Sequence, residues 1–596
     1  MNPQNLIKNK VLTVLKNAIE MLISASYPQL RIQDVKIRIE YSRDEKFGDY
    51  SSPFALENKN VFGKNPKDIA EEIIAKLSGN PLFSEISFSP PGFINFRIAP
   101  KHLWQYVNNF KLNGDLFAKE IQSKKICLEF VSANPTGPMN IVSARSAAYG
   151  DALANLLSSL GHSVKREFYV NDYGNQVNLL GVAVLLRYME SLGETITFQD
   201  VEDERSLYDL IELRILPKES YRGEYIKEIA LEYAKDMNQR DILDNLIASK
   251  KWDEIIETLS RYAVRFNLSN QKKDLELFGV TFDQFFSESK LHEAGDVNKV
   301  PDQLKNNDLK VEDGKLFFLS TQYGDDKDRV IRRDDGRPTY LMADIAYHID
   351  KYKRGFDELI DIWGPDHYGY IARLKGAISS FGKHIDSFRV LIAQQVNLIE
   401  NKEKVKMSKR LGVFQTMTDL LNYLGKNARD VGRYFFLMRS ADMPLDFDLD
   451  LAKDESEKNP VFYIQYAHAR ICSIFRELGE PQIVLDGVQN ESEILSFLKS
   501  DDRARLLFWI ARFPEEIYDA ATSLEPHRIT NYLQALSKAF TKFYGNKENR
   551  IKEKTGLERE TLLLLADSAK LTLYEGLSLL GISAPEKMTK EELQSE

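Results

Sequence analysis

The sequence predicts a multidomain α/β protein built around a doubly wound parallel sheet. Residues 125–171 have the pattern strand, helix, strand, which is the unit that joins neighbouring parallel strands. An α/β pattern returns near residue 337 after a long, charged helical stretch, and only helices are expected from about residue 415 onward. We therefore expect a sheet domain with a helical insertion, an α+β domain before it and an all-helical domain after it.

Composition limits the class of protein. The 596 residues suggest about three or four domains, and 43% hydrophobic with 28% charged residues is ordinary for a folded chain. Eighty basic residues against 89 acidic ones give a net charge of −9, which excludes a protein that coats nucleic acid through bulk positive charge. Local basic patches that grip one nucleic acid stay possible.

Cysteine content and hydropathy predict the compartment. Cys127 and Cys472 are too few for a disulfide framework, and without a Cys-x-x-Cys pair no zinc site is expected. A reducing, cytoplasmic location fits this composition best. The chain has no run of 18 apolar residues, so no membrane span is expected.

The first predicted domain covers residues 1–115 and is α+β. An amphipathic helix over about 5–25 precedes a strand, DVKIRIEYS. A second helix, PKDIAEEIIAKL, has proline in its first turn, where the missing N–H costs no hydrogen bond. A Pro-Pro-Gly turn then feeds the strand of GFINFRI, and the polar segment KLNGDLFAKEIQSKK is expected to be a linker.

The second predicted domain covers residues 122–450. Strand KICLEFVSA, turn NPTGP, a helix over 141–160 that Gly161 ends and strand SVKREFYV open the sheet. A helical insertion is expected over about 175–325. A helix in RPTYLMADIAYHIDKYKRG and strands in DELIDIWGPDH and FRVLIAQQVNLI then complete the domain. The third domain, over 455–596, is expected to be entirely helical.

The turn SANPTGPMNIVSAR is the first candidate site, because ligands of open α/β sheets bind beyond the carboxyl ends of the strands. The following helix offers unpaired N–H groups to a phosphate. A tight β–α connection without a ligand is the alternative. Neither Gly-x-Gly-x-x-Gly nor a P-loop is present.

Two further candidates are a basic loop and a polar helix face. Lys406 and Lys409 in KMSKR can neutralise charge on a polyphosphate, although a solvated basic loop is the alternative. Tyr340, Asp344 and His348 are one helical turn apart and share a face. They lack an evident third metal ligand, which favours a surface pair or a substrate contact; Asp366 and His367 follow the next strand. No nucleophile signature is present, so chemistry here would work by positioning and charge stabilisation.

Taken together, the segments EFVSANPTGP, YLMADIAYH, WGPDH, KMSKR and NPVFYIQYAHARI resemble bacterial arginyl-tRNA synthetases of class I. The resemblance extends to FGDYSSPFAL and PGFINF near the N-terminus and so covers nearly the whole chain. It implies a Rossmann-like catalytic domain with a helical insertion. It also implies an N-terminal domain that touches the corner of the tRNA and a C-terminal helical bundle that binds the anticodon.

The implied enzyme is an ATP-dependent arginine–tRNA ligase. ATP and arginine form arginyl-adenylate, and the arginyl group then passes to the 3′-terminal ribose of the tRNA. The resemblance implies arginine, ATP and tRNA(Arg) as partners, magnesium as the metal that accompanies ATP, no metal held by the protein, and a monomer. By similarity the arginine-binding residues are Glu129, Asn134, Tyr340, Asp344 and Asp366.

The resemblance also implies catalytic, ATP-binding and tRNA-binding residues in this sequence. The catalytic group is Lys406, Lys409, Asn140 and Ser143. The ATP-binding group is Ala133, Asn134, Pro135, Thr136, Gly137, Pro138, Met139, Asn140, Ile141, Val142 and Ser143, with Lys406, Met407, Ser408 and Lys409. The tRNA-binding group is Phe47, Asp49, Tyr466 and Arg470.

The sequence departs from the family at one motif. Asn140-Ile141-Val142-Ser143 stands where the family usually has His-x-Gly-His. Asn140 and Ser143 can donate hydrogen bonds but cannot carry positive charge. This departure motivates one alternative, a non-catalytic tRNA-binding paralogue with a decayed phosphate site. A class I synthetase for another amino acid is the second alternative.

Overall fold

The computed structural model describes residues 3–42, 44–113, 121–199, 206–217, 221, 223–405, 416–481 and 490–588. The chain forms two compact units. One contains residues 1–123, 155–162 and 453–596, and the other contains residues 124–154 and 163–452.

The second unit is built on a five-stranded parallel sheet in the order β14-β13-β5-β6-β9. Its strands are β5 (Lys125–Glu129), β6 (Ser163–Val170), β9 (Gln284–Ser287), β13 (Glu358–Trp363) and β14 (Phe388–Ile392). The central strand β5 is buried at four of its five residues, as its apolar sequence predicts. Helix α6 (Ile141–Ser159) follows β5, and Gly150 lets it approach the strand, since a Cβ there would lie 2.2 Å from the Phe130 ring.

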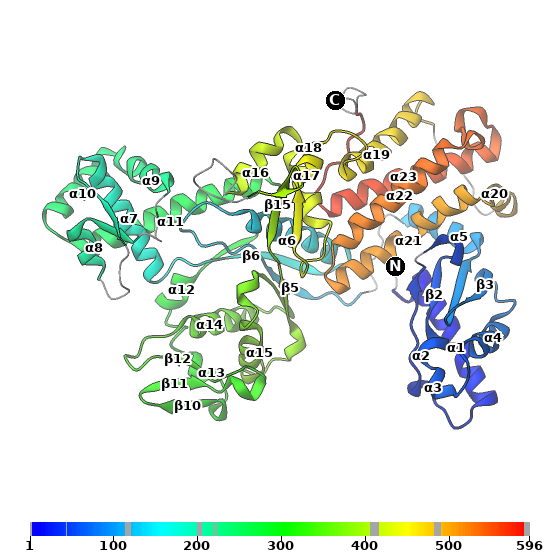
Figure 1. The fold of residues 1–596 in the computed structure, drawn as a ribbon, viewed down its shortest axis with the longest axis horizontal. Coiled ribbons are helices and arrows are strands. Elements are labelled where there is room, and N and C mark those ends of the chain that lie inside the picture. The colour runs from blue at the N-terminus through cyan, green and yellow to red at the C-terminus, as the bar shows by residue number, and fades with distance from the viewer. Residues whose placement is uncertain are drawn as a thin grey trace. The chain divides into compact units, whose positions relative to one another are not determined.

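The helical insertion has a core of its own, and its helices group together in Figure 1. They are α7 (Asn175–Ser191), α8 (Leu207–Leu213), α9 (Glu224–Ala234), α10 (Met237–Ala248) and α11 (Trp252–Leu277), with the short parallel pair β7 (Thr197–Gln199) and β8 (Ile215–Pro217). Gly181 of α7 faces Ser260 of α11, and a Cβ at Gly181 would lie 2.2 Å from the Ser260 hydroxyl oxygen. The two longest helices of the insertion therefore pack closely through a glycine.

After the insertion the chain differs from the expected pattern in one respect. Strand β9 rejoins the parallel sheet inside the stretch 175–325 that the sequence assigned to helices. An antiparallel sheet of β10 (Leu309–Glu312), β11 (Lys315–Phe318) and β12 (Arg329–Arg332) follows. Strands of four residues between charged turns give too little alternation to be recognised from sequence.

The rest of the second unit contains helices and short strands. These elements are α12 (Glu288–Glu293), α13 (Val300–Gln303), α14 (Tyr340–Lys353), α15 (Tyr370–Ser380), β15 (Val396–Glu400), β16 (Glu403–Lys404), α16 (Met417–Leu424), α17 (Ala428–Leu437), β17 (Leu445–Asp448) and α18 (Leu449–Lys453). FRVLIAQQVNLI forms two strands, β14 and β15, that belong to different sheets, not one. Strand β17 pairs with β15 where only helices were expected.

The first unit combines the two ends of the chain. Its N-terminal part has the sheet order β1-β2-β4-β3, with helices packed on it. The elements are α1 (Ile7–Ser26), β1 (Glu40–Tyr41), β2 (Tyr50–Ser52), α2 (Phe54–Glu57), α3 (Lys59–Phe62), α4 (Pro66–Leu77), β3 (Phe83–Ser89), β4 (Phe93–Ile98) and α5 (Pro100–Asn113). Only two residues of DVKIRIEYS pair as a strand, and the first residues of the expected linker belong to α5.

The C-terminal part of this unit is helical, as expected. Its helices are α19 (Pro460–Glu477), α20 (Glu491–Phe497), α21 (Asp501–Ser523), α22 (His527–Gly545) and α23 (Gly556–Leu579). Helices α21 and α22 pack against each other, and α23 contacts both (Figure 1). Buried leucines and phenylalanines of these helices form the core of the bundle.

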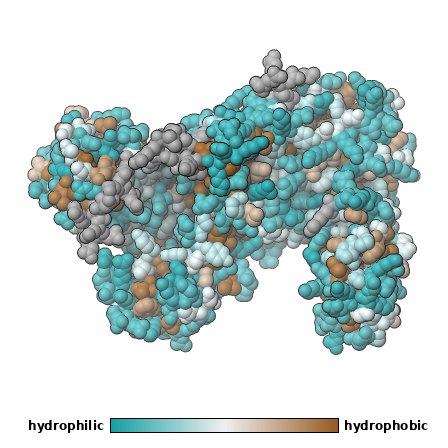
Figure 2. All heavy atoms as spheres, in the orientation of Figure 1, coloured by the Kyte–Doolittle hydropathy of each residue, from teal (hydrophilic) through white to brown (hydrophobic). Residues whose placement is uncertain are grey.

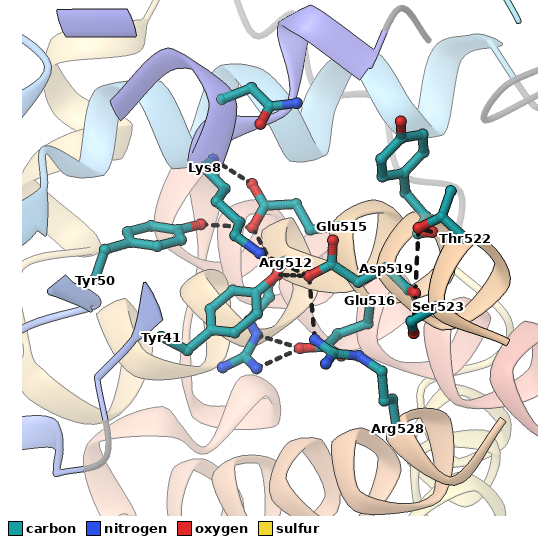
Figure 3. A network of polar contacts seen from close by, with 12 residues as sticks. Lys8, Tyr41, Tyr50, Arg512, Glu515, Glu516, Asp519, Thr522, Ser523 and Arg528 are labelled. Carbon is teal, nitrogen blue, oxygen red and sulfur yellow. Dashed lines mark hydrogen bonds and ion pairs between the residues drawn. The ribbon is translucent and has the colours of Figure 1, made fainter. Parts of the chain in front are cut away.

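A polar network joins the N-terminal sheet to α21 within the first unit (Figure 3). The buried carboxylate of Glu515 accepts hydrogen bonds from the Tyr50 hydroxyl at 2.8 Å and from the Lys8 backbone N–H at 2.6 Å. The Arg512 guanidinium lies 3.5 Å from the centre of the Tyr41 ring. Burial raises the pKa of Glu515 to about 7.

The visible surface is mostly hydrophilic, and its hydrophobic areas are small and separate (Figure 2). Among the described residues, no helix is both long and apolar enough to cross a membrane.

Candidate active site

A cavity of about 510 Å³ opens beyond the carboxyl ends of β5, β6, β9 and β13. This is the edge of an open parallel sheet where ligands bind. Four acids line it, Glu129, Glu288, Asp344 and Asp361, and among the described residues its lining contains no lysine or arginine. Such a cavity suits a ligand that carries positive charge.

Helix α14 contributes one face to the cavity. Tyr340, Asp344 and His348 all line it, so the structure brings together the three residues that helical spacing placed on one face. The Tyr340 side chain is 57% exposed. His348 lies deeper, where Nε2 is 3.0 Å from an Asp361 oxygen and Nδ1 is 2.7 Å from the Asp344 carbonyl oxygen. His348 is thus held by the protein itself.

The strand register aligns three acids, of which Glu129 and Asp361 line the cavity. Glu129 of β5 pairs in register with Asp361 of β13 and with Glu167 of β6. The fully buried Lys351 ammonium is 2.6 Å from a Glu129 oxygen and 2.9 Å from an Asp361 oxygen. Burial raises the pKa of Glu129, and Lys351 opposes that shift. Glu129 therefore reaches the cavity with part of its charge already balanced.

Among the described residues, neither Asp344 nor Glu288 pairs with a lysine or arginine, although Nε2 of His292 lies 3.4 Å from a Glu288 oxygen. Within the described part of the chain, the Asp344 carboxylate makes no ion pair, and burial with neighbouring negative charge raises its pKa to about 7. Glu288, which follows β9, is buried, and burial together with Asp344 raises its pKa to about 7 as well. Two such acids in one cavity can accept hydrogen bonds from a planar cation with several donors.

Sequence reasoning missed Glu288. Its signal would have been an acid directly after a strand of the parallel sheet, at the same edge as Glu129 and Asp344. The sequence pattern does not reveal β9 and places Glu288 in a charged helical stretch. Asp366, in contrast, is exposed and is not among the residues that line the cavity, whereas its neighbour His367 does line it.

The backbone after β5 is strained. Val131 and Ser132 have φ of +69° and +40°, which is unusual for residues with a Cβ, most of all for β-branched valine. The Val131 N–H donates to the Ser146 hydroxyl at 3.1 Å, and the Ser132 hydroxyl donates to Glu129 at 2.9 Å. Strain of this kind is concentrated at functional sites, and here it directs the chain toward Asn134, which lines the cavity.

At the start of α6, Asn140 and Ser143 contact each other. The Asn140 side-chain oxygen accepts hydrogen bonds from the Ser143 backbone N–H at 2.8 Å and from the Ser143 hydroxyl at 3.1 Å. Asn140 thus caps the helix and satisfies one of its free N–H groups. Its side-chain NH₂ makes no hydrogen bond among the described residues.

The predicted lysine loop cannot be placed directly. Lys406, Met407, Ser408 and Lys409 lie outside the described residues. Thr416, the first described residue after 405, forms an isolated antiparallel bridge with Asn140. The Met417 N–H donates to the Met139 carbonyl at 2.9 Å. Thr416 and Met417 are therefore held beside the start of α6.

The four residues predicted to contact tRNA belong to the first unit. Phe47 is 40% exposed. Asp49 is buried, accepts a hydrogen bond from the Ile98 N–H at 2.8 Å and lies 3.8 Å from Arg505, and burial raises its pKa to about 6.

In α19, the Arg470 guanidinium donates a hydrogen bond to the Tyr466 hydroxyl. It also lies 4.6 Å from the centre of the Tyr544 ring of α22. Across the described residues, no group of three histidines, cysteines or acids is arranged to hold a metal ion.

Comparison with known proteins identifies the class and then the family. The family model "tRNA synthetases class I (R), catalytic domain" matches residues 106–432, more than half of the chain, which makes this protein a class I aminoacyl-tRNA synthetase. The models "Arginyl tRNA synthetase N terminal domain" and "DALR anticodon binding domain" match residues 6–98 and 464–588. The chain belongs to the arginyl-tRNA synthetase family.

Individual relatives agree with this placement. The chain is 68% identical over 593 residues to an arginine–tRNA ligase of Leptospira biflexa serovar Patoc, covering 99% of each chain. It is 39% identical over 587 residues to an arginine–tRNA ligase of Bacillus subtilis, covering 98% of this chain and 100% of the relative. The structure of Thermus thermophilus arginyl-tRNA synthetase shares the fold, with a TM-score of 0.72, 21% identity, and coverage of 98% of this chain and 100% of the other.

Proposed function

We propose that this protein is an active arginine–tRNA ligase that uses ATP in two steps. In the first, a carboxylate oxygen of arginine bonds to the α-phosphorus of ATP, and the bond to pyrophosphate breaks. In the second, a ribose hydroxyl at the 3′ end of the tRNA bonds to the carbonyl carbon, loses its proton, and AMP leaves. The acidic cavity around Asp344 and Glu288 is the observation that carries this proposal.

The guanidinium of arginine pairs with the carboxylates of Asp344 and Glu288 in this proposal. A guanidinium is planar and presents five N–H donors in a fixed geometry, which suits carboxylates from two different elements. Tyr340, at the exposed end of the same helix face, covers the aliphatic part of the side chain. Asp366 is exposed and does not line the cavity, so it does not contact arginine in this proposal.

The backbone end of arginine lies toward β5. Glu129 and Asn134 both line the cavity there, and the Lys351 ammonium, 2.6 Å from a Glu129 oxygen, favours the ionised form of that carboxylate. Glu129 accepts hydrogen bonds from the α-ammonium group, and the Asn134 amide contacts the same end of the substrate. This orientation leaves the substrate carboxylate free to attack phosphorus.

ATP binds along residues 133–143, with its phosphates at the start of α6. The first step needs no general base, because the substrate carboxylate is itself the nucleophile. Its requirement is charge stabilisation, which we assign to Lys406 and Lys409, to the amide of Asn140 and the hydroxyl of Ser143, and to magnesium that enters with ATP. The anchoring of Thr416 beside Asn140 supports this place for the lysine loop.

The tRNA is held by both domains of the first unit. Phe47 in the N-terminal domain and Tyr466 with Arg470 in the helical bundle are our proposed contacts. The Asp49 carboxylate is turned toward Arg505 and supports the Phe47 segment. We further propose that the protein acts in the cytoplasm as a monomer.

The test is ATP–pyrophosphate exchange with the protein's own tRNA present. Exchange that needs arginine supports the proposal, and no exchange under these conditions identifies a non-catalytic tRNA-binding paralogue. Amino acid identity is checked by thermal unfolding: arginine at about 100 times its Kd should add ~2.7 kcal/mol of stability. Protection by a different amino acid, with none by arginine, would identify another class I synthetase.

A further inference from the structure

The turn 134–137, between β5 and α6, is held by side chains of the helical insertion. The Gln271 side-chain NH₂ of α11 donates to the Asn134 carbonyl at 3.1 Å and to the Gly137 carbonyl at 2.8 Å. One helical turn earlier, the Asn267 NH₂ donates to the Pro135 carbonyl at 3.0 Å. Three backbone acceptors of the turn thus depend on a single helix.

The fourth carbonyl is bound by a different helix of the insertion. The Tyr225 hydroxyl of α9 donates to the Thr136 carbonyl at 2.9 Å. A Cβ at Gly137 would lie 3.1 Å from that hydroxyl, so the glycine of the turn gives Tyr225 the room it needs. Four successive carbonyls therefore accept hydrogen bonds from α9 and α11.

The turn 134–137 has few hydrogen-bond donors of its own, so bonds from other elements help to hold its shape. Pro135 and Pro138 have no N–H to donate. Gln271 and Asn267 are 1% and 4% exposed, so these bonds are shielded from competing water. The other amide atom of Gln271, Oε1, is buried and finds no partner among the described residues. A buried acceptor without a partner is unfavourable, and the two hydrogen bonds from Gln271 offset that cost.

We infer that Gln271, Asn267 and Tyr225 are positioning residues that assemble the nucleotide and amino-acid site by clamping the turn 134–137. The insertion then acts as part of the active-site scaffold: the turn presents Asn134 and the start of α6 correctly only when α9 and α11 are seated on it. The contact between the turn and the substrates rests on the proposed function. The hydrogen bonds that hold the turn are observed in the structure.

The first test compares Gln271→Leu with a control inside the same insertion. Leucine has similar size and removes both donated bonds. Tyr188→Phe is the matched control, because it removes a 2.7 Å hydrogen bond from Tyr188 to Asp244 that lies within the insertion and does not involve the turn. We expect kcat/KM for arginine-dependent pyrophosphate exchange to fall at least tenfold in Gln271→Leu and less than twofold in Tyr188→Phe, at similar unfolding midpoints. Equal kinetics in the two variants would overturn the inference.

A second variant tests the donor itself. Gln271→Glu can donate a hydrogen bond to the turn only while its carboxyl group is protonated, and it repels the carbonyls when ionised. Its activity relative to wild type should therefore rise as pH falls from 8 to 6, whereas the relative activity of Gln271→Leu should stay constant. A flat ratio for Gln271→Glu would show that the donor is not what matters.

Hydrogen exchange separates this inference from the proposed function. A peptide covering residues 131–141 should exchange faster in Gln271→Leu than in wild type, and Tyr188→Phe should leave it unchanged. This result would establish the clamp even if wild-type protein failed to catalyse exchange of pyrophosphate. Unchanged protection of this peptide in Gln271→Leu would disprove the clamp even if the wild-type enzyme is active.

Discussion

Asp344 and Lys351 lie about two turns apart on α14 and differ in how their charges are balanced. Lys351 is fully buried between Glu129 and Asp361, so its charge is satisfied within the protein. Asp344 faces the cavity without an ion pair among the described residues. One helix thus supplies both a permanent counter-ion for the base of the cavity and an open charge for a ligand.

Asp344→Asn keeps the shape of the side chain and removes its charge. A hydrogen bond to a charged group contributes ~1.5–3 kcal/mol, so KM for arginine should rise roughly ten- to a hundredfold. KM for ATP should change less than about threefold. Asp366→Asn is the control, because Asp366 is exposed outside the cavity. Steady-state exchange kinetics measure both; equal increases in the two KM values would contradict the role of Asp344.

Arginine binding should depend on pH because both cavity acids have pKa values of about 7. A guanidinium needs ionised Asp344 and Glu288, so binding releases protons and Kd for arginine should fall as pH rises from 6 to 8. The stability of the arginine-free protein should change in the opposite direction. Because the two carboxyl pKa values are raised in the native state, the native state keeps protons that the unfolded chain has lost. The free energy of unfolding should therefore fall as pH rises from 6 to 8. Calorimetry in two buffers with different heats of ionisation measures the released protons; no release at pH 6.5 would contradict this prediction.

At the start of helix α6, Asn140 caps the helix, and we propose that it also contacts the phosphates of ATP. Its oxygen caps the helix through Ser143, and its NH₂ has no hydrogen-bond partner within the described part of the chain. A histidine at this position could carry a positive charge, which asparagine cannot. Ser143 donates its hydroxyl to Asn140, so the two replacements form one hydrogen-bonded pair.

Two substitutions at Asn140 separate these functions. Asn140→Ala removes the cap and should lower stability by ~1 kcal/mol. Asn140→Asp keeps the cap and favours the positive helix end, so stability should be retained. The added negative charge should nevertheless raise KM for ATP at least tenfold. Thermal unfolding and ATP-dependent exchange kinetics measure the two effects; an unchanged KM in Asn140→Asp would place the phosphates elsewhere.

Asn140→His tests whether the chain tolerates the family's usual residue. If Asn140 faces the phosphates, the imidazole should support equal or higher kcat for exchange. Complete loss of activity in a folded variant would show that the start of α6 has been rebuilt around the Asn140–Ser143 pair.

The sequence predicts some elements to within a residue and misses others for physical reasons. Helix α4 follows from its N-terminal proline and apolar period, and strand β6 from its position after Gly161. Strands β9 and β17 have only four residues each and are defined by hydrogen bonds to strands far away in the sequence. The local pattern of hydrophobic residues therefore cannot reveal them. The same limit explains why Asp344 was found from helical spacing while Glu288, which depends on recognising β9, was missed.

At the scale of the whole molecule, both ends of the chain fold into one unit. Glu515 of α21 is the buried acceptor that Tyr50 and Lys8 share (Figure 3). Burial keeps its pKa at about 7, well above that of an exposed glutamate. The junction between the two parts of this unit therefore includes a carboxyl group that titrates near neutrality.

Glu515→Gln should reduce the pH dependence of stability. Because the pKa of Glu515 is raised in the folded state, its ionisation costs stability as pH increases from about 4.5 to 7. Glutamine keeps the acceptor oxygen and does not ionise. The unfolding midpoint of the variant should thus fall less than that of wild type between pH 5 and 8. Glu477→Gln, on an exposed part of α19, is the control; parallel pH curves for wild type and Glu515→Gln would contradict the prediction.

The contact between Tyr50 and Glu515 has a consequence for biosynthesis. The two residues are 465 positions apart, and a ribosome that adds 5–20 residues per second needs roughly half a minute to a minute and a half to pass from one to the other. Throughout that interval the nascent N-terminal domain exposes a surface that only the final part of translation can cover. Chains that terminate early, before α21, would leave that surface permanently open to quality-control factors.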